Sequence, residues 1–382
     1  MNICFVCNEY PPGAHGGLGT FTRVLGRALV KAGHGVRVTG CYPASYGGEA
    51  HERDEGVDVW RHAEPAGRLG WIAARHAVYR QVAGWARAGE VDVVEVADWF
   101  GPAAGWPRLP VPVVARLNGS ATFFAGELKR PVGRMAFALE RASLRRVDDW
   151  SSASAFTAER TRALFKLSRP PATILYNPVE PPDTPAEPVV RSATRVVFTG
   201  TLTAKKGVVS LIRAWPAVLA AVPGAELHLY GKDAAADGGG SMREFLSQQL
   251  ASSGTGGVTF HGHVAREAIF AALQRARAAV FPSYAEAFGI APFEAMVRGC
   301  PTIYTAREPG PELVRDGIDG LLVNPDDPDA IAAAILRLLR NDELAAGLGE
   351  QGRRRVLERY SSTVMLPQNE AFFARAVTEF RR

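Results

Sequence analysis

Cysteine is scarce in this chain, and no apolar run is long enough to cross a bilayer: the 382 residues hold four cysteines. Cys4 and Cys7 form a CxxC pair in an apolar segment that predicts a buried strand, and no second CxxC follows. An odd offset in a strand sends the two side chains to opposite faces. We therefore expect buried free thiols rather than a zinc or redox site.

The sequence also lacks the marks of a secreted or nucleic-acid-binding protein. Met1 and Asn2 lead directly into the apolar residues Ile3–Val6, with no basic segment and no small-residue cleavage site, which predicts a cytoplasmic protein without a transmembrane segment. The net charge is +5, but no block of Lys and Arg stands out, so we expect anionic small ligands and no nucleic acid. Peripheral binding to an anionic membrane is the alternative, and the absence of an obvious amphipathic anchor disfavours it.

What the sequence does contain is two series of short apolar segments that alternate with helical patterns. The first series predicts a helix over roughly 127–147 that is rich in basic residues. A solvated basic face is the favoured interpretation of this helix, and a patch that binds a membrane surface or an anionic acceptor is the alternative. Alternation of this kind predicts an α/β fold with doubly wound parallel sheets, whose ligands bind at the carboxyl ends of strands. The proline-rich residues 178–191 have no periodicity and predict a linker between domains at 1–177 and 192–359. The predicted strands are Ile3–Val6, Val36–Thr39, Val91–Val96, Val111–Leu117 and Trp150–Ser152, then Arg195–Thr199, Glu226–Tyr230, Val258–Phe260, Ala278–Phe281, Thr302–Tyr304 and Gly320–Val323.

The segment from Glu286 to Glu294 (EAFGIAPFE) places two carboxylates around a glycine-containing turn that follows a predicted buried strand. A helix starting near Ala291 or Pro292 would leave the N–H groups around Phe288 to Ala291 available to an anion. A diphosphate bound there would have a carboxylate on each side for a hydroxylated ring, as a nucleotide-sugar requires. Two solvated glutamates on an ordinary capped helix are the alternative, and the spacing alone does not decide between them.

A glycine-rich loop follows the first predicted strand, and it runs through Gly16, Gly17 and Gly19. Such a loop lets backbone N–H groups approach a phosphate closely, although a tight turn into the next helix is the simpler alternative. The loop is not a G-x-G-x-x-G motif, because Thr22 stands where the last glycine belongs. The second strand ends at Thr39 and not at an acidic residue, so the motif argues against a dehydrogenase.

The second series opens in the same way, with Gly200 and Thr201 followed by Lys205 and Lys206 at a helix entrance. A phosphate ligand would use one lysine as a charge clamp, and we favour this over a solvated pair because of the position at a strand end. In the first series, Asp98 and Asn118 follow two other strands, and the two loops would line the opposite wall of a cleft between the domains. For Asp98, a turn or helix-capping residue is an equal alternative.

Taken together, these residues resemble the family-four retaining glycosyltransferases of the GT-B fold, in which two Rossmann-like domains face a central cleft. The resemblance covers nearly the whole chain in order and spacing. Its elements are Glu9-Tyr-Pro-Pro, Gly16-Gly17-Leu18-Gly19, Gly33-His34, Ser154, Asn177-Pro178-Val179, Lys206-Gly207, Gly262-His263-Val264, Glu286 to Glu294, and Glu312 to Gly317 with Gly320.

The resemblance implies roles for matching positions. Glu286 would hold hydroxyls of the donor sugar, Glu294 would hold the ribose, and Lys206 would neutralise the departing diphosphate. It also implies that the segment 360–382 is a helix that crosses back to the N-terminal, acceptor-side domain. The residues that would take part in catalysis are Glu286, Lys206 and Asn118. Those that would bind the donor are Gly16, Gly17, Thr201, Lys205, Lys206, Val264, Glu286, Phe288, Gly289, Ile290, Ala291 and Glu294, and those that would bind the acceptor are His15, Asp98 and Asn118.

Two positions depart from the family pattern. Thr201 stands where the family usually has a cationic phosphate ligand, and Lys205 is the residue that would compensate for its loss. Asn118 stands where the family often has histidine, and an amide can hydrogen-bond a sugar hydroxyl but cannot act as a base. Both departures leave open a non-catalytic nucleotide-sugar-binding partner subunit.

The resemblance implies transfer of a sugar from a UDP- or GDP-sugar to an acceptor hydroxyl with retention of configuration. No cofactor or metal is obligatory in such a reaction, and the sequence has no DxD pair that would read as a metal site of this family. The acceptor would be a natural product, a polysaccharide or another glycoside. A nucleotide-sugar epimerase is the alternative on the same architecture.

Overall fold

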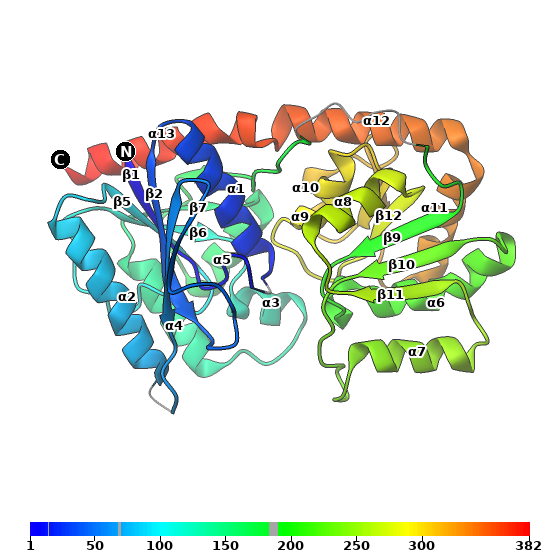
Figure 1. Ribbon diagram of the computed structural model, residues 1–382, viewed down its shortest axis with the longest axis horizontal. Coiled ribbons are helices and arrows are strands. Elements are labelled where there is room, and N and C mark those ends of the chain that lie inside the picture. The colour runs from blue at the N-terminus through cyan, green and yellow to red at the C-terminus, as the bar shows by residue number, and fades with distance from the viewer. Residues whose placement is uncertain (14, 68–69, 183–189) are drawn as a thin grey trace. The chain divides into compact units, whose positions relative to one another are not determined.

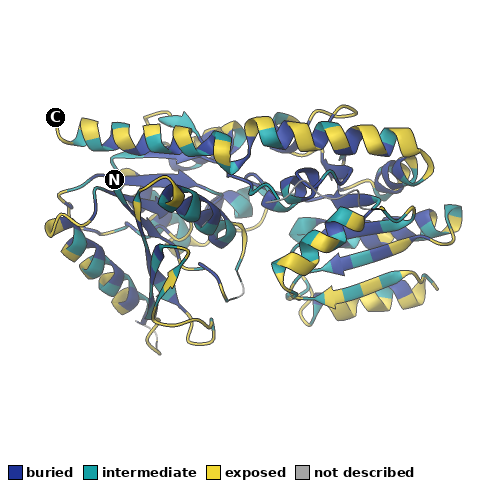
Figure 2. Cartoon of the chain, turned by 45° about the horizontal axis from the view of Figure 1, so that its top comes forward, coloured by how far each residue is buried: buried dark blue, intermediate teal, exposed yellow. Residues whose placement is uncertain are grey.

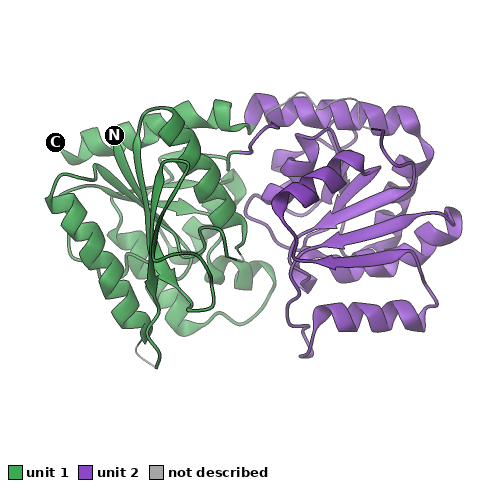
Figure 3. Cartoon of the chain, viewed as in Figure 1, with its two compact units in different colours: residues 1–178, 360–382 green, residues 179–359 purple. Residues whose placement is uncertain are grey.

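The chain folds into two compact units in the computed structural model, which describes residues 1–13, 15–67, 70–182 and 190–382 (Figure 3). Unit 1 comprises Met1–Pro178 and Tyr360–Arg382, and unit 2 comprises Val179–Arg359. Half of the expected linker of 178–191, namely residues 183–189, lies outside the described residues. Each unit has its own sheet and its own core.

The unit 1 sheet has eight strands in the order β3-β4-β2-β1-β5-β6-β7-β8 (Figure 1). Every adjacent pair is parallel except β3 and β4, and the predicted parallel α/β architecture is therefore confirmed. The strands are β1 (Asn2–Val6), β2 (Gly35–Tyr42), β3 (His51–Asp54), β4 (Val57–Ala63), β5 (Val93–Ala97), β6 (Val113–Leu117), β7 (Asp149–Ser152) and β8 (Thr173–Ile174).

Helices cover both faces of this sheet, and every residue of its central strands β5 and β6 is buried. Buried side chains of α2, α4 and α5 pack with those of β1, β5 and β6 in one apolar cluster. On the other face, α13 packs against α1 and β5, with the rings of Phe5 and Phe373 6.2 Å apart. The helices are α1 (Gly17–Lys31), α2 (Gly70–Arg87), α3 (Ala121–Glu127), α4 (Arg134–Arg146), α5 (Ala155–Phe165) and α13 (Ser362–Phe380).

The helix expected over roughly 127–147 forms as α4, but it begins only at Arg134, and the preceding short helix α3 was not predicted. Ser120 caps α3 by accepting a hydrogen bond from the Phe123 N–H, 3.1 Å away. Pro131 lies between the two helices; it has no N–H to donate and disfavours helical geometry at the residue before it. The antiparallel β3–β4 hairpin and helix α2 were not predicted. The hairpin turns at Glu55 and Gly56, which both have positive φ (44° and 89°), as a type I′ turn requires.

The unit 2 sheet has six parallel strands in the order β11-β10-β9-β12-β13-β14. The predicted strands of the second series all form. They are β9 (Arg195–Thr199), β10 (Glu226–Tyr230), β11 (Val258–Gly262), β12 (Ala278–Phe281), β13 (Thr302–Thr305) and β14 (Leu321–Val323). Between them lie η1 (Ala204–Lys206), α6 (Val208–Ala221), α7 (Met242–Ser252), α8 (Arg266–Arg275), α9 (Ile290–Met296), α10 (Gly310–Leu313), α11 (Pro328–Arg340) and α12 (Asp342–Arg359).

The core of unit 2 lies between the sheet and helices α6, α7 and α11, around the buried Trp215. Figure 2 shows that the central strands are dark blue, whereas the outer faces of the helices are largely exposed. The four cysteines are unpaired, and Cys4, Cys7 and Cys300 are buried, which confirms the expectation of free thiols. Within the described residues, no helix combines the length and apolar character needed to span a membrane.

Candidate functional site

The carboxyl ends of β9 and β12 bring the predicted residues of unit 2 together, because these strands are neighbours in the sheet. After β9 the chain turns through Gly200 into the short helix η1, which carries Lys205 and Lys206. Gly207 ends η1 with a φ of 73°, and a Cβ there would lie 1.8 Å from the Pro282 carbonyl oxygen. Only glycine permits this approach, which holds the lysines against the segment after β12.

Glu286 is held by Lys206 in a nearly buried ion pair. The Lys206 Nζ donates to Oε1 of Glu286 at 2.7 Å, and the Ser283 hydroxyl donates to the same oxygen at 2.8 Å. Burial by itself would raise the pKa of Glu286, but the charges of Lys206 and Lys205 and these hydrogen bonds outweigh it and hold the pKa below its ordinary value. The carboxylate is therefore ionised and fixed in one orientation.

Lys205 adds a second cation beside this pair. The Tyr284 N–H donates to the Lys205 carbonyl oxygen at 2.8 Å, which ties the two strand ends together. Burial and the neighbouring Lys206 charge lower the pKa of Lys205 to about 8, against the opposing attraction of Glu286. Lys206 thus pairs with the buried carboxylate of Glu286 while Lys205 adds a second positive charge near it, and the excess positive charge favours an anionic ligand.

The turn after Glu286 approaches the sheet closely. Gly289 has a φ of 79°, and a Cβ there would lie 2.7 Å from the hydroxyl oxygen of Tyr304. The Tyr304 hydroxyl donates to the Phe288 carbonyl at 2.9 Å and so fixes the turn. Helix α9 starts at Ile290, one residue earlier than expected, and no preceding helical turn supplies carbonyl partners to the N–H groups of Ile290 and Ala291.

Glu294 on α9 is also paired. Arg266, the first residue of α8, donates to Oε1 of Glu294 from Nη2 at 2.5 Å and from Nε at 3.2 Å. Arg266 also lies 3.5 Å from the carboxylate of Glu180 and over the ring of Phe270. Val264 lies two residues before Arg266, in the turn between β11 and α8, and Thr201 follows Gly200 after β9. Arg266 thus orients the Glu294 carboxylate, whose second oxygen has no hydrogen-bond partner among the residues that the structure describes.

In unit 1, Asp98 and Asn118 lie at the carboxyl ends of the neighbouring strands β5 and β6. Asp98 is 1% exposed, and its two carboxylate oxygens accept the N–H groups of Asn118 at 3.0 Å and Gly119 at 3.1 Å. Burial raises the pKa of Asp98 to about 7 despite these hydrogen bonds, and the nearby Glu140 carboxylate adds to the rise. The Asp98 side chain thus shapes the turn that carries Asn118.

The Asn118 side chain pairs with Asn177. Its Oδ1 accepts from the Asn177 Nδ2 at 3.0 Å. The remaining polar atoms of the two amides, Asn118 Nδ2 and Asn177 Oδ1, are buried and have no hydrogen-bond partner among the described residues. One is a donor and the other an acceptor, so a single hydroxyl group is chemically able to satisfy both.

The glycine-rich loop of unit 1 is built around Glu9. The carboxylate of Glu9 accepts the Gly19 N–H at 2.8 Å, and a Cβ on Gly16, the residue that caps α1, would lie 3.3 Å from the same carboxylate. Gly17 is the first residue of α1, and the His15 ring bonds the Gly13 carbonyl at 2.7 Å. A carboxylate therefore occupies the helix terminus where a phosphate was expected to approach.

Sequence reasoning missed several residues that shape these sites: Glu9, Asn177, Ser283, Tyr304 and Arg266. Glu9 and Asn177 stand inside motifs that were recognised without a role for these side chains. Ser283 lies three residues before Glu286, but nothing local indicates that its hydroxyl reaches the carboxylate. Tyr304 and Arg266 come from other elements, so their contacts depend on strand order.

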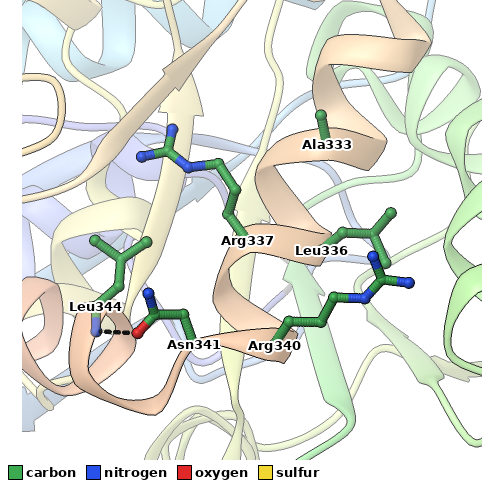
Figure 4. Close-up of a pocket in the computed structure, with 6 residues that line it drawn as sticks. All are labelled: Ala333, Leu336, Arg337, Arg340, Asn341 and Leu344. Atoms are coloured by element: carbon green, nitrogen blue, oxygen red, sulfur yellow. Dashed lines mark hydrogen bonds between the residues drawn. The ribbon is translucent and has the colours of Figure 1, made fainter.

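A separate surface cavity of about 640 Å³ lies on α11 and the start of α12 (Figure 4). Arg337 and Arg340 line it, and Arg340 also donates to the Ala221 carbonyl at 2.9 Å. None of the predicted site residues lines this cavity. In the part of the chain that the structure describes, no group of three or more His, Cys, Asp or Glu side chains is arranged to hold a metal ion.

Two parallel-sheet units of this kind define the GT-B class of glycosyltransferases. Among solved structures, the fold is similar to sucrose-phosphate synthase from Thermosynechococcus elongatus, with a TM-score of 0.80, 20% sequence identity and 99% of each chain covered. Residues 15–182 match the family described as Glycosyltransferase Family 4, and residues 193–341 match Glycosyl transferases group 1.

Curated relatives agree with this class. The chain is 28% identical over 380 residues to glycogen synthase of Mycobacterium tuberculosis, covering 93% of this chain and 90% of that protein. It is 30% identical over 302 residues to a GDP-mannose-dependent monoacylated α-(1-6)-phosphatidylinositol monomannoside mannosyltransferase of Corynebacterium glutamicum, covering 73% of this chain and 75% of that protein. The chain belongs to glycosyltransferase family 4, and it is a glycosyltransferase.

Proposed function

We propose that this glycosyltransferase moves a sugar from a nucleoside-diphosphate-sugar to an acceptor hydroxyl with retention of anomeric configuration. The observation that carries the proposal is the buried, ionised Glu286 held by Lys206, with the second cation Lys205 beside it. In this proposal unit 2 binds the donor and unit 1 supplies the acceptor-side residues.

The lysines serve the departing diphosphate. As the bond between sugar and phosphate breaks, negative charge grows on the phosphate oxygen, and preorganised cations stabilise that charge most strongly where water is excluded. The Lys206 ammonium group donates hydrogen bonds to the phosphate as well as to Glu286. Lys205 supplies the positive charge that the family usually has at the position of Thr201. Backbone N–H groups from Phe288 to Ala291 complete the anion site.

The carboxylates serve the two rings of the donor. Glu286 accepts hydrogen bonds from hydroxyls of the transferred sugar, and its fixed orientation selects their positions. Glu294, oriented by Arg266, accepts from the ribose through its remaining oxygen, and Val264 borders the base. Both UDP- and GDP-sugars fit this scheme, and the GDP-mannose dependence of the Corynebacterium glutamicum relative supports the latter.

On the acceptor side, the amide pair of Asn118 and Asn177 binds one hydroxyl as both donor and acceptor. Neither amide can take a proton, so the acceptor hydroxyl passes its proton to the departing phosphate. His15 and the Asp98 turn border the same acceptor-binding region of unit 1. Relatives named for glycogen synthesis and for a glycolipid support a glycoside hydroxyl as the acceptor.

The first measurement is thermal unfolding with UDP, GDP and ADP and their sugar conjugates, each with and without EDTA. A ligand at about 100 times its Kd stabilises the folded state by about 2.7 kcal/mol, which raises Tm by several degrees. We expect a shift that is selective for one base and unaffected by EDTA. The selected donor is then used with glycoside acceptors, and the anomeric configuration of the product is read by NMR.

Site variants separate the roles. Glu286→Gln should lower kcat at least about 100-fold with a smaller change in nucleotide affinity. Lys206→Ala should lower both kcat and the affinity for the nucleotide. Glu244→Gln on the exposed face of α7 is the matched control. Full turnover by a Glu286→Gln/Lys206→Ala double variant would contradict the site assignment. Isomerised donor without release of nucleotide would instead indicate an epimerase, and binding without turnover a non-catalytic subunit.

A further inference from the structure

All the exposed large apolar side chains among the described residues of unit 1 lie in three segments. These are the start of α2, the turn after β5, and the loop that leads into α4. Their side chains are Ile72 (46% exposed), Trp99 (40%), Phe100 (49%), Val132 (38%) and Met135 (64%). Single exposed apolar residues are common, but a group confined to one part of a unit indicates a surface that meets an apolar partner.

The three segments lie at the carboxyl edge of the unit 1 sheet. The turn of Trp99 and Phe100 follows β5, whereas α2 and α4 each begin at this edge and lead back to the start of the next strand (Figure 1). Arg75 on α2 donates to the Phe100 carbonyl at 3.1 Å, and the Phe100 N–H donates to Glu140 on α4 at 3.1 Å. The segments therefore form one continuous surface.

The same segments carry positive charge and very little exposed negative charge. No acidic residue occurs from Pro65 to Gly89, from Trp99 to Gly126, or from Leu128 to Leu139. Within the last stretch, Lys129, Arg130 and Arg134 are exposed beside Val132 and Met135. Of the flanking acids, Glu127 pairs with Arg160 at 2.7 Å, and Glu140 is fully buried, so neither adds an exposed, unpaired negative charge to this stretch.

We propose that this basic–apolar surface, defined by Ile72, Trp99, Phe100 and residues 129–135, docks on an anionic lipid bilayer. Cations attract the negatively charged headgroups, and the apolar side chains between them enter the boundary between headgroups and acyl chains. A soluble polyanion would satisfy the lysine and arginines but would leave the five apolar side chains in water. The docked edge is also the one that carries Asp98 and Asn118, so the surface brings bilayer headgroups to the acceptor-side residues. The docking is independent of the proposed transfer, because it needs no donor.

The test is co-sedimentation of the full chain with vesicles of phosphatidylcholine alone and of equal parts phosphatidylcholine and phosphatidylglycerol, without donor. We expect binding to the anionic vesicles that weakens as salt rises from about 0.1 M to about 0.5 M. Each basic residue near such a surface raises the partition coefficient of the protein between water and anionic vesicles about fivefold. The Lys129→Glu/Arg134→Glu variant should therefore lower this coefficient about 25-fold or more. Val132→Ser/Met135→Ser should lower it at least about fivefold, since two apolar side chains no longer enter the bilayer.

Unit 2 offers matched controls for both changes. Arg353→Glu/Arg354→Glu reverses two exposed cations on α12, and Phe245→Ser/Ile318→Ser removes two exposed apolar side chains. Neither should change the partition. Quenching of tryptophan fluorescence by brominated lipid, reduced in Trp99→Phe, would locate the contact. Equal loss in the control variants, binding to heparin without binding to vesicles, or no vesicle binding by a folded sample would each overturn the proposal.

Discussion

Lys205 is the residue whose charge is most sensitive to pH near neutrality in the proposed donor site. Its pKa is lowered to about 8 by burial and by the adjacent Lys206. Only the protonated ammonium attracts a diphosphate, so binding is strongest below pH 8 and weakens as pH rises through that value. If the neutral form contributes nothing, UDP or GDP should bind about tenfold more weakly at pH 9 than at pH 7.

Isothermal titration between pH 7 and pH 9 checks this decline, in a range where a phosphate group with a second pKa of about 6 is already at least about 90% ionised. Lys205→Arg should bind with little pH dependence, because a guanidinium stays charged throughout. Lys205→Met should be equally flat but weaker at pH 7. A decline of the same size in Lys205→Arg would show that another group titrates.

At the scale of elements, Glu140 joins α4 to two other segments of unit 1. Its carboxylate accepts the N–H groups of Phe100 at 3.1 Å, Ala121 at 2.9 Å and Thr122 at 3.1 Å. Glu140→Gln places an NH₂ group against at least one of these donors. We expect the free energy of unfolding to fall by about 2 kcal/mol, because a buried N–H left without an acceptor costs about 1–3 kcal/mol.

For a unit of this size, that loss corresponds to a decrease in Tm of about 4–8 °C. Glu159→Gln, on the exposed side of α5, is the control and should leave Tm unchanged. An unchanged Tm in Glu140→Gln would mean that the three N–H groups find other acceptors. Helix α3 was not predicted from the sequence: the carboxylate that accepts its first N–H groups belongs to α4, and helical periodicity does not reveal such a contact.

At the scale of the whole chain, unit 1 depends on residues from both ends of the sequence. Arg116, 1% exposed on β6, donates to both oxygens of Glu95 at 2.9 Å and to Oδ1 of Asn369 on α13 at 2.5 Å. Asn369→Ala leaves a buried guanidinium with one fewer acceptor. A hydrogen bond to a charged group is worth about 1.5–3 kcal/mol, so unit 1 should be destabilised by that amount.

Hydrogen–deuterium exchange shows which part of the chain loses stability in the Asn369→Ala variant. We expect faster exchange in β1, β5 and α1 of unit 1, with β9 and β10 of unit 2 unchanged. Gln368→Ala, on the exposed side of the same helix, is the control. Equal acceleration in both units would show that α13 stabilises the chain as a whole and not unit 1 in particular.

Local pattern in the sequence determined the architecture of this protein. Alternating apolar and helical segments suffice for two parallel sheets, and parallel topology sends Lys206, Glu286, Asp98 and Asn118 to strand carboxyl ends whatever the strand order. The alternation of apolar and polar residues was too weak to predict the β3–β4 hairpin. At the turn of this hairpin, Glu55 adopts a positive φ that its residue type seldom takes.

Only the tertiary structure decided which of these side chains meet. Lys206 reaches Glu286 because β9 and β12 are neighbours in the sheet, although six elements separate these two strands in the chain. Asn177 reaches Asn118, and Asn369 reaches Arg116, across 59 and 253 residues. Propensity and periodicity describe neighbours along the chain, whereas the charge state and orientation of a buried group depend on partners that folding brings from elsewhere.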